Sequence, residues 1–578
     1  MNRIVEYLVR TAGSRRIDCL VLLALFAPAL FLHLGRSPLL VPDEARYAEI
    51  PREMLESGDF ITPRLNYVVY FDKPALYYWL NALSFTVFGE TEFSARLFSA
   101  LAGLGTILLT WRLGWALYGR RVALFSALIL GTSVGFVVQA RLNTIDMTLT
   151  FLMTATLCAF VAAARRGGDG KAGYYYLAYA CTALMVLAKG LIGIVLPGVI
   201  MLICVALYGR WRLIPRMRPV RGLLLILLLC APWFILVSVR NPGFVRYFFV
   251  HEQFQRFLST HHQHSEPFWY FIPILAGLMF PWSWFLPVSL LRSARRIGRG
   301  AGLPDLFFFV WAAVIFVFFS SSGSKLASYI LPMFPAAALL TGRMLSSAMD
   351  DGISSLRRQA LCLAALLYAG AVGILIYPLV ARHPNLSAVG CATIGIALAC
   401  GGMLAARAIR RADIARYFLG LVVTSYAWCV AGPPFVLEGW EHSKSLKELA
   451  TIVRAEARPG DTVLSFDFYA QDIPFYARRR VASVDVPREL EYGSAQGDQT
   501  GWFMDYGQFY ALWDSRGTLF VIIHEDDMPT LATHARTPAR VLGKKGHIIL
   551  ITNRPARPRS GVRLAPDGTT SAPRTRGC

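Results

Sequence analysis

The chain has 578 residues, of which 55% are hydrophobic and only 16% are charged, and its mean hydropathy is +0.47. Soluble domains carry roughly 25% charged residues, so this composition excludes an ordinary soluble protein and indicates an integral membrane protein. The net charge of +22 does not indicate a nucleic-acid-binding protein, because the arginines lie in short connectors and not among exposed aromatic residues.

Apolar blocks of about twenty residues follow one another through the first three quarters of the chain, which predicts a bundle of about thirteen membrane-spanning helices. The spans are predicted near residues 17–35, 94–117, 122–139, 147–164, 174–188, 191–208, 222–239, 269–291, 304–321, 326–342, 359–378, 388–406 and 416–436. Alternate connectors are rich in arginine, and the positive-inside rule assigns them to the cytoplasm. The long loops 36–93 and 240–268 and the C-terminal part are then expected on the opposite face.

From about Glu438 the composition changes to that of a soluble domain. Strand-like runs at 461–468, 480–486, 518–524 and 547–552, with a helical stretch at 472–478, predict a small α/β domain. The predicted organisation is a transmembrane domain at 1–437, a periplasmic α/β domain at 438–554 and a disordered tail at 555–578, which is rich in Pro, Arg, Gly and Ser.

The loop 36–93 is much longer than a connector between two spans needs to be. Residues 45–55 and 73–88 have apolar positions at helical spacing, which predicts two helices lying in the membrane interface. Asp43 and Glu44 stand at the start of the first helix, where a carboxylate either caps the helix or takes part in chemistry. Other residues of the same loop could supply acid, base and phosphate-binding groups, and they favour a role in chemistry. These residues are Arg46, Tyr47, Asp72, Lys73, Tyr77 and Tyr78.

Other charged residues are expected at the same face of the membrane. Asp146, at the outer end of a span, either caps the next helix or is a second functional carboxylate. Lys189 and Lys325 lie in tight external turns, where a cation either reaches lipid headgroups or captures an anion. Tyr329 stands close to Lys325 in the sequence and could supply a hydroxyl donor.

The second long loop contains Arg256, which is a candidate phosphate ligand, and the neighbouring pair His251 and Glu252. His251, Glu252 and Asp72 are candidate metal ligands, but no HExxH or comparable spacing is present, so a divalent metal stays an open alternative. Carboxylates and cations at the outer surface predict an enzyme that acts on an anionic lipid. A transporter would need charged residues deep in the spans, and the spans contain almost none.

The segments VPDEARYAEIPREML and YFDKPALYYW resemble the first external loop of the aminoarabinose transferases of lipid A modification. The resemblance continues through RLNTIDM, MVLAKGLIG, FVRYFFVHEQFQRF, HSEPFWYFIPIL, GSKLASYILP and ELEYG. This family is part of the polytopic GT-C glycosyltransferases, which include the protein O-mannosyltransferases. The resemblance implies a monomeric enzyme of the bacterial inner membrane that moves 4-amino-4-deoxy-L-arabinose from undecaprenyl phosphate to lipid A phosphate groups, conferring polymyxin resistance.

The resemblance also implies roles for individual residues. Asp43, Asp146 and Glu44 match catalytic positions, and Lys73 matches the lysine of an acidic-Lys-Pro motif in which Asp72 stands in place of the usual Glu. The residues implied to hold the carrier phosphate are Lys73, Arg256, Tyr329, Lys325, Arg46 and Tyr47.

Two questions stay open at this point. Asp43 is expected to orient the acceptor, to stabilise oxocarbenium character or to hold the ammonium group of the sugar. The alternatives to the function are another polyprenyl-phosphate-sugar glycosyltransferase with a protein or glycan acceptor, and a lipid-linked sugar flippase.

Overall fold

The structure is a computed structural model, and it describes residues 4, 6–7, 10, 12–166, 172–255, 266–299, 303–352, 356–380, 388–432 and 444–554. The chain divides into two compact units. The first contains Met1–Lys447 together with Ala470–Arg480 and Arg488–Gln499. The second contains Glu448–Tyr469, Val481–Pro487 and Thr500–Cys578. The predicted tail at 555–578 lies outside the described residues.

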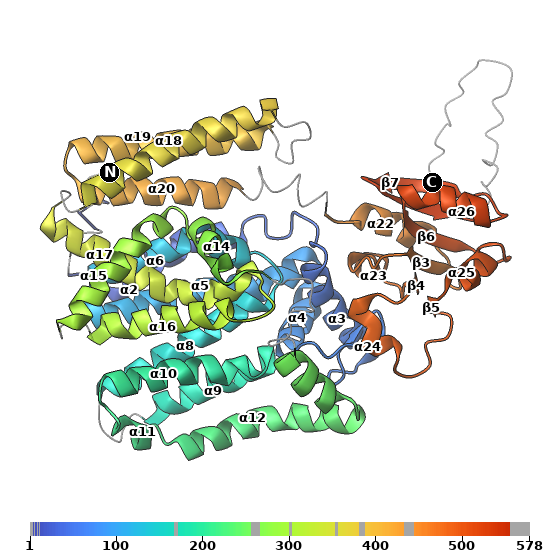
Figure 1. Cartoon of the computed structure of the whole chain (residues 1–578), viewed down its shortest axis with the longest axis horizontal. Helices are drawn as coiled ribbons and strands as arrows, with labels where there is room; N and C mark the ends of the chain where they lie inside the picture. Colours follow the sequence, from blue (N-terminus) through green and yellow to red (C-terminus); the bar gives the residue numbers. More distant parts are fainter. Residues whose placement is uncertain are drawn as a thin grey trace, which may run out of the picture. The chain divides into compact units, whose positions relative to one another are not determined.

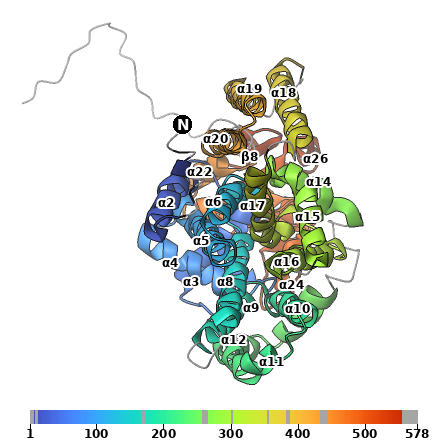
Figure 2. The same ribbon diagram turned by 90° about the vertical axis from the view of Figure 1, so that its left-hand side faces the viewer.

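The first unit is a bundle of long helices that run roughly parallel in Figure 1, and several of them are seen nearly end-on in Figure 2. Its helices are α2 (Arg15–Phe31), α5 (Glu92–Tyr118), α6 (Arg120–Gly131), α7 (Val134–Ala140), α8 (Ile145–Arg166), α9 (Ala172–Lys189), α10 (Ile192–Leu207), α11 (Leu213–Arg216), α12 (Pro219–Arg240), α14 (Phe271–Leu278), α15 (Leu286–Gly298), α16 (Leu303–Ser320), α17 (Phe334–Asp351), α18 (Arg357–Val380), α19 (Ala388–Arg410) and α20 (Ile414–Gly432). Shorter helical turns are η2 (Arg246–Gln255), η3 (Phe268–Tyr270), η4 (Trp282–Phe285) and η5 (Ala327–Met333). Large side chains such as Trp282 and Trp311 are fully buried between these helices.

Apolar side chains also cover the outside of the bundle, which is the reverse of a soluble protein. Only 28% of the most apolar stretch of α12 is buried, and Leu228 is 70% exposed. Such a surface is stable only where lipid replaces water, so the chain is a multi-pass membrane protein.

Among the described residues, helix length and composition identify fewer spans than the sequence predicts. Among the described residues five helices are long and apolar enough to cross a membrane, and seven if each of two bent helix pairs is one span. Helices α10, α16 and α20 are apolar but shorter. The number of thirteen spans therefore stays a prediction.

Two of the predicted spans are broken in the structure. Helices α6 and α7 meet at 67°, and the helical segments on either side of Met279–Pro281 meet at 118°. At the first break the hydroxyls of Thr132 and Ser133 donate to carbonyls one turn earlier, which competes with the helical ladder. At the second break Pro281 has no amide hydrogen with which to continue a helix.

The loop 36–93 folds as the sequence predicts. The two expected helices are α3 (Asp43–Ser57) and α4 (Leu76–Phe88), and a small hairpin of β1 (Arg64–Leu65) and β2 (Val68–Val69) lies between them. Two segments from far along the chain complete this part of the first unit. These are α23 (Asp472–Ala477), whose Phe475 packs with Phe85, and the turn η8 (Arg488–Leu490) followed by α24 (Glu491–Ser494).

Helix α23 contains a buried carboxylate, Asp472, which accepts hydrogen bonds from the Ser445 hydroxyl at 2.8 Å and the Leu446 amide at 2.6 Å. Burial raises the pKa of Asp472 to about 6 from its usual value near 3.8. A raised pKa means that the native state binds the proton more tightly, so the stabilisation from protonation is complete below about pH 4 and is lost as the pH rises through about 6.

We therefore expect Asp472→Asn, which keeps an acceptor oxygen without the charge, to stabilise the protein at pH 7. The difference in free energy of unfolding between the variant and the wild type should decrease by roughly 1 kcal/mol between pH 7 and pH 5. Thermal unfolding of both proteins in detergent at the two pH values measures this difference. An advantage that is independent of pH would show that Asp472 does not titrate in this range.

The second unit is a six-stranded sheet in the order β5-β4-β3-β6-β8-β7. Its elements are α22 (Lys447–Glu456), β3 (Thr462–Phe466), β4 (Ala482–Val484), β5 (Phe503–Met504), α25 (Tyr506–Trp513), β6 (Leu519–His524), η9 (Glu525–Asp527), α26 (Met528–His534), β7 (Arg540–Lys545) and β8 (Ile548–Thr552). The first four strands in the order are parallel to one another, with Leu464 opposite Val521. Strand β8 is antiparallel to both of its neighbours, β6 and β7. Trp513 and Phe509 fill the core beside the sheet.

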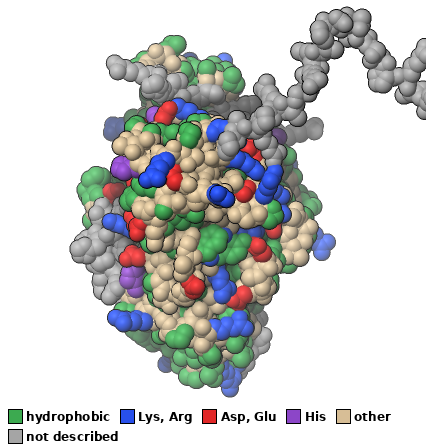
Figure 3. Space-filling view, turned by 90° about the vertical axis from the view of Figure 1, so that its right-hand side faces the viewer, with side chains coloured by type: hydrophobic (Ala, Val, Ile, Leu, Met, Phe, Trp, Pro, Cys, Tyr) green, Lys and Arg blue, Asp and Glu red, His purple; other side chains and the backbone are tan. Residues whose placement is uncertain are grey.

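The surface near α25 and α26, which are labelled in Figure 1, is less apolar than that of the helical bundle. Figure 3 shows this face with basic and acidic side chains interspersed and with hydrophobic side chains in small groups only. Such a surface is typical of a domain in water, in agreement with the change of composition near Glu438.

Candidate active site

A cavity of about 450 Å³ in the first unit collects most of the charged residues that the sequence singles out. The cavity is lined by Leu40, Val41, Pro42, Asp43, Glu44, Arg46, Tyr47, Tyr70, Asp72, Lys73, Gln139, Leu142, Thr144, Ile145, Asp146, Lys189, Leu326, Ser328, Tyr329 and Lys444. Because carboxylates, cations and tyrosines line one cavity beside a helix bundle, the cavity suits a substrate with a phosphate and a polar group.

Asp43 is the accessible carboxylate of this cavity. It is the first residue of α3, directly after the N-cap residue Pro42, and half of its side chain is exposed. Its Oδ1 lies 3.0 Å from Nη1 of Arg46, one turn along the helix. The Nε of Arg46 pairs with Glu489, whose other oxygen accepts from Gln471 at 2.7 Å. Arg46 is therefore held from both sides, and Asp43 keeps a free edge toward the cavity.

Glu44 also belongs to the cavity wall but is almost fully buried. Its two oxygens form a bidentate ion pair with Arg96, at 2.8 and 2.7 Å. The same carboxylate accepts from the backbone amides of Asn143 at 2.7 Å and Leu40 at 3.0 Å. This geometry fits a residue that holds α3 against α5 and the turn before α8, and so fixes the direction of Asp43.

Asp146 stands in the first turn of α8 and forms an ion pair with Lys189, at the end of α9. Both side chains are nearly buried. The ammonium of Lys189 also lies 4.6 Å from the centroid of the Tyr329 ring, at cation-π distance. Lys189 thus joins a carboxylate and an aromatic ring that belong to other helical segments, and it does not extend to lipid headgroups.

Asp72 and Lys73 occupy the other side of the cavity. Asp72 accepts hydrogen bonds from the hydroxyls of Tyr70 and Tyr247, each at 3.0 Å. Lys73 donates to the backbone carbonyl of Asp72 at 2.8 Å and lies 3.5 Å from Glu252. This lysine is partly exposed, so its ammonium can turn toward an anion in the cavity.

The candidate metal ligands do not come together. His251 lies 3.7 Å from Glu252, but no group of three His, Cys, Asp or Glu side chains suited to a metal ion occurs in the part of the chain that the structure describes. Asp72 is engaged by two tyrosine hydroxyls. These residues, as they are placed, do not fit a metal centre.

The remaining candidates have different surroundings. Tyr47 is buried with its ring edge-on to that of Tyr77, and burial raises its pKa, so its hydroxyl stays protonated. Tyr329 lines the cavity. Lys325 does not line it, because its ammonium donates to the backbone carbonyls of Glu266 and Ser322, both at 2.7 Å. Arg256 lies outside the described residues.

Sequence reasoning missed the residues that hold the site in place. Glu489 lies 443 positions from Arg46 in the chain, and its only sequence signal is the ELEYG segment of the family resemblance. Arg96 looked like an ordinary arginine at the start of a span. Lys189 was noted as an unusual external cation, but its pairing with Asp146 depends on how α8 and α9 pack.

Comparisons with known proteins show that the helix bundle and the C-terminal domain have a membrane glycosyltransferase fold. The model of the dolichyl-phosphate-mannose-protein mannosyltransferases matches residues 72–236, and that of the aminoarabinose transferase C-terminal domain matches residues 449–553. The crystal structure of ArnT from Cupriavidus metallidurans bound to undecaprenyl phosphate superimposes with a TM-score of 0.81 and 27% identity, over 94% of this chain and 99% of that one.

Two relatives carry the name undecaprenyl phosphate-alpha-4-amino-4-deoxy-L-arabinose arabinosyl transferase. The protein of Enterobacter sp. (strain 638) is 30% identical over 82% of this chain and 86% of its own length. The protein of Edwardsiella ictaluri is 35% identical over 54% of this chain, and the match spans 56% of that relative. The chain belongs to the family of these arabinosyl transferases, as the sequence resemblance indicated.

Proposed function

We propose that the protein transfers 4-amino-4-deoxy-L-arabinose from undecaprenyl phosphate to phosphate groups of lipid A. The observation that carries the proposal is the cavity in which the accessible carboxylate of Asp43 and the ion pair of Asp146 and Lys189 lie with Arg46 and Lys73. Membership of the family supports this donor, which the names of the relatives contain.

The reaction is an inverting displacement at the anomeric carbon. An oxygen of the lipid A phosphate forms the new bond to that carbon while the bond from the carbon to the carrier oxygen breaks. The electron pair of the broken bond leaves with undecaprenyl phosphate. A phosphate group is already ionised near neutral pH, so the attacking group needs little help from a general base.

The work of the protein is then to position both lipids and to balance charge. Lys73 and Arg46 face the place where negative charge develops on the leaving phosphate, and cations fixed there stabilise the transition state. Tyr47, protonated because of its burial, adds a hydroxyl donor at the cavity wall. Asp43 carries the complementary negative charge for the sugar, whose anomeric carbon and ammonium group are both positive in the transition state.

Both lipids reach the cavity from the membrane. By the positive-inside rule the loop 36–93 and the C-terminal sheet face the periplasm, where the outer leaflet of the inner membrane supplies carrier and acceptor.

A second candidate has a specific observation in its favour, because residues 72–236 match the protein mannosyltransferases. It is a polyprenyl-phosphate-sugar transferase with a protein or glycan acceptor. Mass spectrometry of lipid A from cells with and without the gene separates the two. We expect lipid A with added aminoarabinose only when the gene is present. Identical lipid A in both strains would contradict the proposed acceptor.

Replacing Lys73 by Ala should weaken carrier binding, because the variant removes a cation from the cavity wall without touching the Arg96–Glu44 pair that holds the loop. We expect the affinity for undecaprenyl phosphate to fall at least tenfold, since ion pairs with phosphate in a partly buried site contribute about 1.5–3 kcal/mol. Binding of a labelled undecaprenyl phosphate to the purified protein measures it.

The matched control is Lys447→Ala, which removes a partly exposed lysine of the same unit that pairs with Glu92 and does not line the cavity. This control should bind the carrier like the wild type. Undiminished affinity in Lys73→Ala would remove Lys73 from the carrier site.

A further inference from the structure

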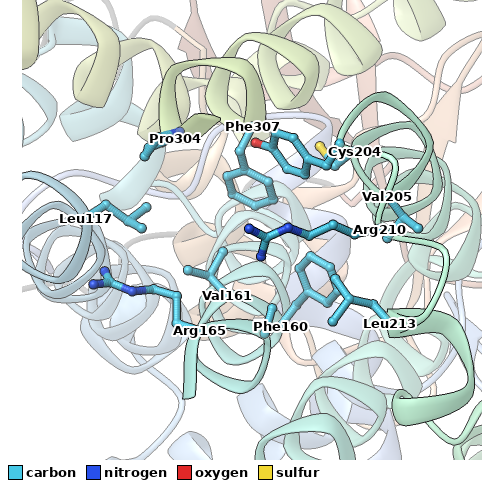
Figure 4. A pocket seen from close by; sticks show the side chains of 12 residues that line it. Leu117, Phe160, Val161, Arg165, Cys204, Val205, Arg210, Leu213, Pro304 and Phe307 are labelled. Carbon is cyan, nitrogen blue, oxygen red and sulfur yellow. The ribbon is translucent and has the colours of Figure 1, made fainter. Parts of the chain in front are cut away.

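A second cavity lies at the opposite end of the helices from the candidate active site. Its volume is about 310 Å³, and Figure 4 shows it from close by. It is formed where α5, α8 and α10 end and α16 begins, and it is lined by Leu117, Phe160, Val161, Ala164, Arg165, Cys204, Val205, Tyr208, Arg210, Leu213, Pro304 and Phe307. Asp146 and Arg165 are at the two ends of α8, about 28 Å apart at the helical rise of 1.5 Å per residue. The two cavities are therefore separate sites.

The wall of this second cavity is apolar, and its polar groups are mainly two arginines. In Figure 4 the side chain of Arg210 extends between Phe307 and Val161, and Arg165 lies on the side of Leu117. Both arginines are exposed to solvent. An apolar chamber with two guanidinium groups at its edge matches a molecule with a hydrocarbon chain and an anionic head.

The charge of this edge is positive. The buried acid Asp305, which follows Pro304 of the cavity wall, is held by Arg296 at 3.1 Å and Arg343 at 3.0 Å. Within the described ranges neither Arg165 nor Arg210 makes a salt bridge.

The surroundings put the cavity at the level of lipid headgroups. Trp211 follows Arg210 and is exposed, as is Leu207 one turn before it. Tryptophan beside arginine on an apolar surface is typical of the membrane interface. The same connector carries Arg212, Arg216, Arg218 and Arg221, and the positive-inside rule assigns such a connector to the cytoplasmic side.

We propose that this cavity binds an anionic glycerophospholipid of the cytoplasmic leaflet. One acyl chain lies against Phe160, Val161 and Phe307, and the headgroup phosphate lies between Arg165 and Arg210. The site is independent of the transfer reaction, since none of its residues lines the cavity that contains Asp43.

The test is native mass spectrometry of the full-length protein in detergent, titrated with phosphatidylglycerol or with phosphatidylcholine. The wild type should bind one phosphatidylglycerol at least tenfold more tightly than phosphatidylcholine. The double variant R165Q/R210Q should lose this preference. The matched control R212Q/R216Q removes the same charge from the same connector, outside the cavity, and should keep the preference.

A second variant, Ala164→Phe, tests the chamber by filling it while both arginines stay in place. It should lower the affinity for phosphatidylglycerol at least tenfold. The proposal is overturned if both double variants lose the preference equally, if Ala164→Phe binds like the wild type, or if the two phospholipids bind alike. It is also overturned if undecaprenyl phosphate displaces phosphatidylglycerol at equal concentration, because the site would then belong to the carrier.

Discussion

Replacing Asp43 by Asn is expected to lower the rate of sugar transfer about a hundredfold or more, because it removes a preorganised charge from the reacting centre. The protein should stay folded, since Arg46 keeps its second partner, Glu489, and an amide of the same size fills the same space. The measurement is transfer to lipid A by the purified variant in membranes, with carrier binding measured alongside. If Asp43 acts on the transition state, the catalytic rate falls and carrier affinity changes little.

Glu56→Gln is the matched control for this experiment. Glu56 is on the same helix, its side chain is exposed to the same degree as that of Asp43, and it does not line the cavity. The control should transfer at the wild-type rate. Unchanged lipid A modification and unchanged polymyxin resistance in Asp43→Asn would show that Asp43 is not catalytic.

Replacing Glu44 by Gln is expected to have the largest effect on stability. The variant leaves the guanidinium of Arg96 buried without its bidentate partner, and breaking a buried ion pair on one side costs about 3–5 kcal/mol. Unfolding of the variant in detergent measures the loss. We expect activity to fall in proportion to the amount of folded protein, because Glu44 supports the loop and does not contact substrate in this account.

Two further variants serve as controls for this prediction. Asp350→Asn breaks an exposed pair with Arg121 in the same unit and should cost less than about 1 kcal/mol. The double variant E44Q/R96Q should cost less than the sum of its single variants, because no unpaired charge remains. A fully stable but inactive Glu44→Gln would contradict the supporting role and favour direct catalysis.

The fold class and most elements of the C-terminal sheet could be predicted because local patterns determine them. The runs that became β3, β4, β6 and β8 are apolar and β-branched, and all four were predicted. Strand β7 contains three cations and a glycine, so only its pairing with β8 reveals it as a strand. The bends at Thr132 and Pro281 were missed because hydropathy averages over a span and does not register a local break.

In the candidate site too, some residues could be predicted from local sequence and others could not. The loop residues Asp43, Arg46 and Lys73 stand out in the sequence, and they do line one cavity. Long-range pairs such as Arg46 with Glu489 and Lys189 with Asp146 depend on tertiary packing and leave no local pattern. Lys325 is the converse case: its ammonium donates hydrogen bonds to two backbone carbonyls and does not line the cavity, so its role in phosphate binding stays a prediction.

The most direct test of the proposed function is a reaction of the purified protein in liposomes with two lipids only, undecaprenyl phosphate-aminoarabinose and lipid A. Mass spectrometry of the lipid A product is the readout. We expect lipid A that carries one or more aminoarabinose groups, together with one undecaprenyl phosphate released for each group transferred. Lipid A that stays unmodified while the donor is bound or flipped across the bilayer would contradict the account.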